Sequence, residues 1–124
     1  MMVHDVAWEQ RDPAELLGEI TRLRAEVTRL EARVEELDRL AHRDGLVPLA
    51  NRPGMLRELE KMIARHERHG IPSAMLFVDL NDLKLLNDNF GHIGGDAALV
   101  NVAEKLLAGT RANDFVARLG GDEF

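Results

Sequence analysis

A strict heptad pattern of apolar residues in the first third of the chain most constrains its fold. Between residues 16 and 41 the apolar positions alternate spacings of four and three: Leu16, Ile20, Leu23, Val27, Leu30, Val34, Leu37 and Ala41. This spacing puts the side chains in one narrow seam along an α-helix, which is typical of a coiled coil. The sequence therefore predicts a long helix that pairs with another helix.

Signals at both ends of the pattern define this helix. Asp12 is a good N-cap, Pro13 suits the first helical position, and Glu15 stands where a capping-box acid belongs. The Asp44-Gly45 pair ends the repeat. We therefore expect a tail over residues 1–12, a coiled-coil dimerisation helix over residues 13–43 and a separate domain over residues 44–124.

The residue types in the seam predict the partner. The a positions are β-branched and the d positions are leucine, a combination that favours two parallel strands and hence a homodimer. Charged residues that would then face each other are Glu19 with Arg24, Glu26 with Glu31, and Arg33 with Asp38. The alternative is an amphipathic helix packed on its own domain, although such a helix usually has a wider apolar face.

Composition disfavours several classes of protein. The formal net charge is −6, and neither half of the chain is basic, so nucleic-acid binding is disfavoured. Cysteine is absent, which excludes disulfides and thiolate metal sites and suits a reducing cytoplasm. The longest apolar run, residues 74–78, is too short to span a bilayer, and the N-terminus lacks signal-peptide features. We expect a soluble, cytoplasmic protein without a membrane span.

Residues 44–124 alternate helical and strand-like patterns. Helical patterns cover residues 53–69, 82–90 and 96–108, with a glycine-rich turn at residues 91–95. The apolar runs 74–78 and 115–119 indicate strands, the first buried on both faces. The expected inward-facing residues are Met55, Leu59, Met62 and Ile63, followed by Leu99, Val102, Ala103, Leu106 and Leu107. The pattern predicts an α/β (α+β) fold, a mixed sheet backed by helices, that is incomplete where a return strand would follow residue 124.

Acidic residues and glycines follow both expected strands. Asp79 comes directly after residues 74–78, and Gly120-Gly121-Asp122-Glu123-Phe124 follows residues 115–119. Open α/β sheets gather ligand chemistry at strand ends, glycines let phosphates approach the backbone, and Mg²⁺ prefers oxygen ligands. We expect Asp79 and Asp122 to hold one Mg²⁺ together. A strand-end cap for Asp79 and a solvated turn for Asp122 and Glu123 are the structural alternatives.

Asn87 and Asp96 offer the hydrogen-bonding groups needed to recognise guanine. The amide both donates and accepts, and the carboxylate accepts two hydrogen bonds, which matches the edge of that base. A helix C-cap for Asn87 and an N-cap for Asp96 are the structural alternatives. For His92, which stands between them in the sequence, the structural alternative to a ligand contact is a loop hydrogen bond.

The order of these motifs resembles the GGDEF family of diguanylate cyclases over residues 44–124. The segments that carry the resemblance are Asp79-Leu80-Asn81-Asp82-Leu83-Lys84, Asn87-Asp88, Gly91-His92, Gly95-Asp96 and Gly120-Gly121-Asp122-Glu123-Phe124. The resemblance implies a nucleotidyl-cyclase-like fold and the condensation of two GTP into cyclic di-GMP and two pyrophosphates across a domain dimer. A catalytically silent domain that senses GTP or cyclic di-GMP, or a coiled-coil dimerisation protein, are the alternative functions, and the 124 residues alone are expected to be inactive.

The resemblance also implies roles for individual residues. The metal ligands would be the Asp79 side chain, the Leu80 carbonyl and the Asp122 side chain. Catalytic roles fall to Asp122, Glu123 and Lys84, guanine contacts to Asn87, His92 and Asp96, and substrate contacts to Gly120 and Gly121.

Arg111-Ala112-Asn113-Asp114 stands five residues before Gly120 and resembles the RxxD site at which this family binds its own product and is inhibited. The guanidinium could pair with a phosphate or stack on guanine, and Asp114 could accept from the base. A surface ion pair is the alternative.

Four positions depart from the family pattern. Asn81 replaces a usual Asp, Leu83 replaces a common Phe, and Val47-Pro48 replaces a frequent Thr-Gly. The charge lost at Asn81 would weaken a second metal if that position assists one.

Overall fold

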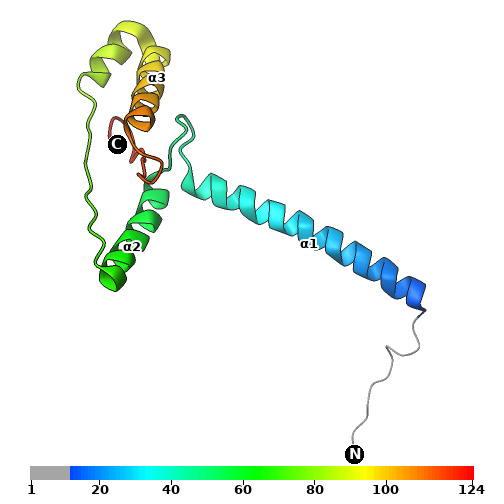
Figure 1. The fold of residues 1–124 in the computed structure, drawn as a ribbon. Coiled ribbons are helices and arrows are strands. Elements are labelled where there is room, and N and C mark those ends of the chain that lie inside the picture. The colour runs from blue at the N-terminus through cyan, green and yellow to red at the C-terminus, as the bar shows by residue number, and fades with distance from the viewer. Residues whose placement is uncertain (1–11) are drawn as a thin grey trace, which may run out of the picture. The chain divides into compact units, whose positions relative to one another are not determined.

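The computed structural model describes residues 12–124, and three helices make up most of that part (Figure 1). They are α1 (Pro13–His42), α2 (Arg52–His69) and α3 (Leu83–Gly109). The chain divides into one unit that ends at Leu37 and a second unit, Asp38–Phe124. The last turn of α1 therefore belongs to the second unit.

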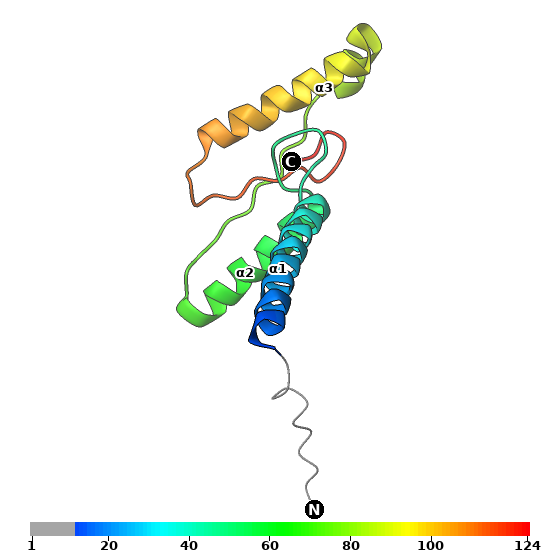
Figure 2. The same cartoon turned by 90° about the vertical axis from the view of Figure 1, so that its right-hand side faces the viewer.

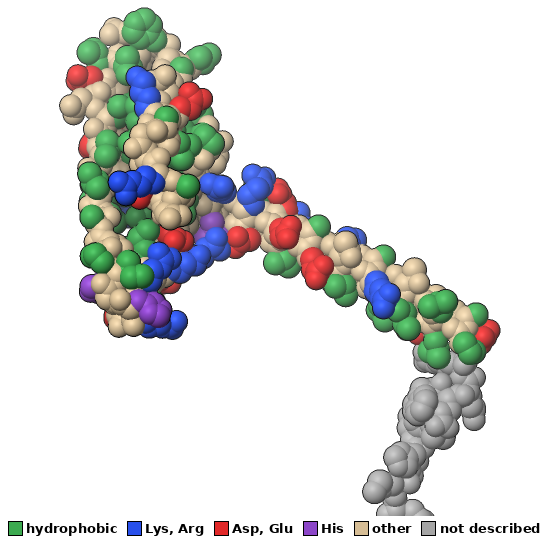
Figure 3. Space-filling view, in the orientation of Figure 1, with side chains coloured by type: hydrophobic (Ala, Val, Ile, Leu, Met, Phe, Trp, Pro, Cys, Tyr) green, Lys and Arg blue, Asp and Glu red, His purple; other side chains and the backbone are tan. Residues whose placement is uncertain are grey.

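Helix α1 begins where the sequence predicted. The Asp12 side chain accepts a hydrogen bond from the backbone N–H of Ala14 at 3.1 Å. Six seam residues are between 45% and 64% exposed, and hydrophobic side chains follow α1 in Figure 3; the six are Ile20, Leu23, Val27, Leu30, Val34 and Leu37. No helix among residues 12–124 is both long enough and apolar enough to cross a membrane. The parallel dimer stays a prediction.

Helix α2 matches its predicted span to within one residue. Asn51 caps its start by accepting from the N–H of Gly54 at 2.9 Å. Gly70 ends it in the left-handed conformation, at φ 65°, where glycine is favoured. Of the side chains expected to face inward, Met55, Leu59 and Met62 are half-buried; the prediction is wrong for Ile63, which is 51% exposed.

Helix α3 contains the two helices that the sequence predicted, joined by a kink at Gly91 instead of the glycine-rich turn predicted over residues 91–95. Only Gly91 leaves the helical conformation, at φ 71° and ψ 178°, and it produces a kink; Gly94 and Gly95 are helical. One residue with positive φ is enough to redirect the backbone, so a turn of several residues is not needed. Leu99 and Ala103 are buried as predicted, whereas Leu107 is exposed.

Neither predicted strand forms among residues 12–124; only isolated bridges occur there. The expectation that residues 74–78 are buried on both faces is wrong, since Leu76 is 79% and Phe77 is 73% exposed. Of this segment only Val78 pairs its backbone, with Phe124. A strand needs partner backbone along its whole length, and the described residues supply partners only next to residues 78–80 and 117–119. The α/β sheet therefore remains unconfirmed.

A small core holds the second unit together. Its buried members are Val47, Leu49, Leu99, Ala103 and Phe124, which come from the connector between α1 and α2, from α3 and from the last residue. In Figure 2 the red C-terminal segment runs beside this connector, and Ala50 bridges Ala117 there. Phe124 thus anchors the end of the glycine turn in the core.

Candidate active site

The glycines form a tight turn. Leu119 donates its N–H to the carbonyl of Glu123 at 2.8 Å, and Glu123 donates to the carbonyl of Gly120 at 3.0 Å. Gly120 has φ 142° and Gly121 has φ 51°, values that side chains rarely tolerate. A tight glycine turn is therefore present after residue 119 without long strands on either side.

Backbone pairing brings this turn to Asp79. Val78 and Phe124 exchange hydrogen bonds of 2.8 and 2.7 Å, and Leu80 donates to the carbonyl of Asp122 at 2.9 Å. The charge of Asp122 raises the pKa of Asp79, and desolvation, a hydrogen bond with Asp122 and the charge of Glu123 act in the same direction. The structure thus brings Asp79, Asp122 and Glu123 together.

The carboxylate pair suits a hard cation. Two like charges at short range oppose each other unless a cation lies between them, and carboxylate oxygens are ligands that Mg²⁺ prefers. Within residues 12–124 no group of three or more His, Cys, Asp or Glu side chains could hold a metal ion. A metal here would therefore take two carboxylates and complete its shell with carbonyl, water or phosphate oxygens.

Arg118 supports the glycine turn, and the sequence did not single it out. Its guanidinium donates to the carbonyl of Gly121 at 2.8 and 3.1 Å, and to the two carboxylate oxygens of Asp44 at 3.3 and 3.4 Å. Desolvation alone would raise the pKa of Asp44. Hydrogen bonds from the N–H groups of Val47 and Leu46, together with Arg118, outweigh desolvation and lower it. An arginine two residues before a pair of glycines was the available signal, since such a turn exposes carbonyls.

Asn87 lies against Gly95 in α3. A Cβ at residue 95 would collide with the Asn87 side-chain amide, so only glycine leaves room for it. Asn87 is half-buried, whereas His92 and Asp96 are exposed. Both capping alternatives are wrong, because Asn87 and Asp96 lie inside α3. The Asn87 amide therefore lies against Gly95, the residue that precedes Asp96 in the sequence.

The turn between Asp79 and α3 has an unusual backbone. Asp82, the residue before α3, is left-handed at φ 62° and makes no side-chain capping bond. Positive φ in a residue other than glycine is uncommon and clusters at functional sites. Lys84 lies in the first turn of α3 and is exposed.

Arg111 and Asp114 form a local turn. Asp114 Oδ2 accepts from the N–H of Arg111 at 2.8 Å, and the N–H of Asp114 donates to the carbonyl of Arg111 at 3.0 Å. In the described part of the chain Arg111 makes no ion pair, so the surface ion pair is wrong. Its exposed guanidinium is available to a ligand. No hydrogen bond or ion pair between residues 12 and 124 joins this turn to the Asp79–Asp122 pair or to Asn87.

Comparison with known proteins identifies the family. A family model described as diguanylate cyclase, GGDEF domain, matches residues 41–124. The bifunctional diguanylate cyclase/cyclic di-GMP phosphodiesterase MucR of Pseudomonas aeruginosa is 46% identical over 89 residues, which are 72% of this chain and 13% of MucR.

Two solved structures from Caulobacter crescentus are similar. A sensory box/GGDEF family protein is 43% identical with a TM-score of 0.62, over 67% of this chain and 53% of that one. The coiled coil and GGDEF domain of DgcB, in complex with c-di-GMP, is 32% identical with a TM-score of 0.74, over 87% and 56%. This chain thus spans about an eighth of MucR and about half of each structure, and it belongs to the GGDEF-domain family of diguanylate cyclases.

Proposed function

We propose that the complete protein is a diguanylate cyclase. In this reaction the 3′-hydroxyl oxygen of one GTP attacks the α-phosphorus of another, the bond to the β-phosphate breaks, and pyrophosphate leaves. The hydroxyl loses its proton, and repetition in the other direction closes cyclic di-GMP. The observation that carries the proposal is the backbone pairing of residues 78–80 with residues 122–124, which sets Asp79 beside Asp122.

The acidic pair and the glycine turn would receive the triphosphate. Asp79, the Leu80 carbonyl and Asp122 would hold Mg²⁺, which when bound would neutralise phosphate charge. Glu123 lies beside them and would accept the proton of the attacking hydroxyl. Lys84 would contribute positive charge toward the phosphates, and Gly120 and Gly121 would let them approach the backbone.

The α3 kink region would recognise the base. The Asn87 amide and the Asp96 carboxylate supply complementary donors and acceptors for the guanine edge, with His92 nearby in sequence after the kink. The close fit of Asn87 over Gly95 supports this role, because it orients the amide without binding energy from the ligand.

The turn at Arg111 and Asp114 would bind the product and inhibit synthesis. The Arg111 guanidinium is exposed and makes no ion pair in the described residues, which suits phosphate pairing or stacking on guanine. The related DgcB structure contains c-di-GMP, and so does a second GGDEF-domain structure that is 36% identical to this chain.

The exposed seam of α1 would join two copies of the chain. Each domain would hold one GTP, so neither domain could complete the reaction alone. A shared coiled coil would raise the effective concentration of the second domain. The β-branched and leucine positions support a parallel homodimer.

Turnover of GTP by the complete protein with Mg²⁺ tests the proposal. Wild type should form cyclic di-GMP, and Asp122→Ala should lose at least about a hundredfold in rate. Asp88→Ala, which removes an exposed carboxylate on α3, should keep the wild-type rate. Guanine nucleotide binding without any product from wild type would instead identify a sensor domain.

A further inference from the structure

Arg118 holds one peptide group of the glycine turn. The N–H of Glu123 donates to the carbonyl of Gly120 at 3.0 Å and closes a four-residue turn, of which Gly121 and Asp122 are the central residues. Arg118 donates to the carbonyl of Gly121 from Nη2 at 2.8 Å and from Nε at 3.1 Å. This carbonyl belongs to the central peptide of the turn, and two hydrogen bonds from one planar guanidinium fix the direction in which it points.

The orientation of this central peptide distinguishes two types of tight turn. A type I′ turn has positive φ at both central residues, whereas a type II′ turn has it only at the first, and the central peptide is rotated by about 180° between them. Gly121 has φ 51°, and among the residues other than glycine between 12 and 124 only Asp82 has positive φ, so Asp122 does not. The turn therefore has the type II′ pattern, and the contact of Arg118 with the Gly121 carbonyl stabilises it.

The same peptide turns the N–H of Asp122 to the side opposite Arg118. A trans peptide is planar, with its carbonyl and its N–H pointing in opposite directions, and no peptide bond among the described residues is cis. The N–H of Asp122 makes no hydrogen bond to any of residues 12–124, and Gly121 next to it is exposed. A backbone donor is thus left open beside the acidic pair of Asp79 and Asp122.

Arg118 is held in place from its other side. Its Nη1 donates to both carboxylate oxygens of Asp44 at 3.3 and 3.4 Å, and its backbone N–H donates to the carbonyl of Ala50 at 2.9 Å. The Arg118 and Asp44 side chains are only 14% and 15% exposed, so water screens this ion pair less than one on the open surface. The guanidinium is therefore oriented before a ligand binds, and binding does not have to order it.

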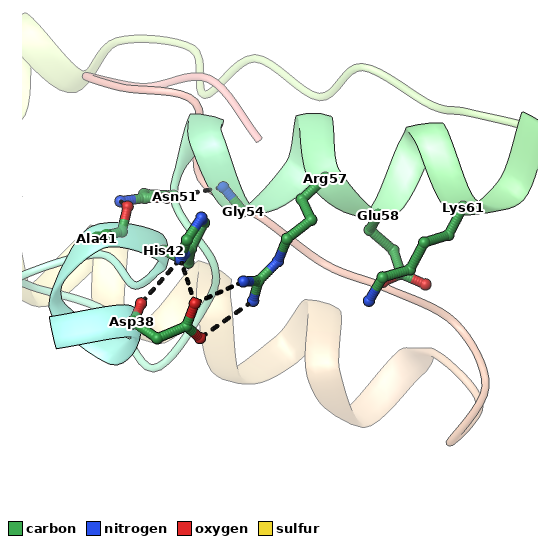
Figure 4. Close-up of polar contacts among 8 residues, drawn as sticks. All are labelled: Asp38, Ala41, His42, Asn51, Gly54, Arg57, Glu58 and Lys61. Atoms are coloured by element: carbon green, nitrogen blue, oxygen red, sulfur yellow. Dashed lines mark hydrogen bonds and ion pairs between the residues drawn. The ribbon is translucent and has the colours of Figure 1, made fainter. Parts of the chain in front are cut away.

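Asn51 fixes the connector that carries Asp44 (Figure 4). Its side-chain Nδ2 donates to the carbonyl of Ala41 at 2.9 Å, and its Oδ1 accepts from the N–H of Gly54 at 2.9 Å. The N–H of Asp44 donates to the carbonyl of Leu49 at 2.9 Å, which closes the connector on itself. The support of Arg118 is thus built independently of the glycine turn.

We propose that Arg118 is a positioning residue of the cyclase: by holding the carbonyl of Gly121 it presents the N–H of Asp122 as a hydrogen-bond donor to a phosphate oxygen of the nucleotide. The inference rests on the proposed function, because it needs a triphosphate beside the acidic pair. Backbone N–H groups in tight turns bind anions, and the two glycines have no side chain that would cover this one. A donor that is already oriented stabilises charge without rearrangement during the reaction.

NMR of the complete protein tests the contact. In the presence of Mg²⁺, a nonhydrolysable GTP analogue should move the Asp122 amide proton downfield, because an N–H that donates to phosphate is deshielded. Guanosine with the same Mg²⁺ is the matched control: it has the base but no phosphate, so it should shift the Asn87 side-chain amide and leave the Asp122 N–H in place. An analogue that binds without moving the Asp122 proton would overturn the proposal and leave the cyclase assignment standing, as would an equal shift with guanosine. No binding of the analogue to wild type would overturn both.

Two variants of Arg118 separate positioning from stability. Lysine keeps the positive charge but has no planar fork that reaches Gly121 and Asp44 together, so Arg118→Lys and Arg118→Ala should both lose the downfield shift. Their kcat should fall about a hundredfold, with a smaller change in the affinity for guanosine. Arg65→Ala, at an exposed position of α2, should keep the shift and the rate. If Arg118→Lys is folded, as judged by its other amide resonances, and keeps the shift or the wild-type kcat, Arg118 does not position this peptide.

Discussion

Arg118 binds Asp44 across 74 residues of sequence and at the same time holds the carbonyl of Gly121. The two side chains are only 14% and 15% exposed, and Asp44 Oδ1 also accepts from the N–H groups of Leu46 and Val47 at 2.8 and 2.9 Å. The connector after α1 and the glycine turn are therefore positioned by one ion pair. This contact supports the turn that carries Asp122.

Replacing Arg118 should destabilise the second unit. Arg118→Ala leaves the Asp44 carboxylate and the Gly121 carbonyl without these partners, and we expect a loss of about 2 kcal/mol in the free energy of unfolding. Urea denaturation followed by circular dichroism measures it. Arg65→Ala, at an exposed position of α2, should change the value by less than about 0.5 kcal/mol; equal losses in both variants would contradict the role of Arg118.

Stability should depend on pH through Asp44. Its pKa is lowered in the folded protein, so the ionised carboxylate stabilises the fold above its ordinary value of about 3.9. That contribution is lost as the pH falls from about 4 through the lower folded value. The difference in unfolding free energy between wild type and Asp44→Asn should shrink over this acidic range. A difference that stays constant down to the folded pKa would show that the charge of Asp44 does not matter.

Magnesium should stabilise the folded protein through the acidic pair. Asp122 raises the pKa of Asp79, so the two carboxylates repel each other without a cation, and a bound divalent ion would relieve this repulsion. We expect Mg²⁺ to raise the melting temperature of wild type and to leave that of Asp79→Asn nearly unchanged. Calorimetry with and without Mg²⁺, in a buffer of constant ionic strength, measures both. An equal rise in the two proteins would place the ion elsewhere.

A methyl group at residue 95 should weaken guanine binding. Gly95→Ala would displace the Asn87 amide, and losing one or two oriented hydrogen bonds should cost about tenfold in GTP affinity. Gly109→Ala is the matched control, since it lies at the end of the same helix and a Cβ there meets nothing within 4 Å. Titration calorimetry with a nonhydrolysable GTP analogue, on the complete protein, compares them. Similar affinities would remove Asn87 from the base site.

A charge in the α1 seam should dissociate the dimer. Leu30→Lys puts a charge at a central d position of the heptad, whereas Ala32→Lys puts the same charge at an f position on the outer face. Light scattering after size-exclusion chromatography should show dimers for wild type and Ala32→Lys and monomers for Leu30→Lys. If Leu30→Lys stays dimeric, the seam is not the interface.

The sequence by itself determined the features that depend on local patterns. The heptad and the Asp12 cap predicted α1, the helical pattern over residues 53–69 predicted α2, and the motif order identified the GGDEF family. Helix periodicity and capping act within a few residues, so a linear pattern contains them.

Only the tertiary structure decided which distant groups meet. Arg118 reaches Asp44, Arg57 reaches Asp38, and Asn87 covers Gly95 because packing and backbone geometry place them together. The strand predictions were wrong for the same reason. Apolar runs at residues 74–78 and 115–119 favour extended backbone, but a strand forms only where another segment pairs with it, and among residues 12–124 that partner reaches only a few positions.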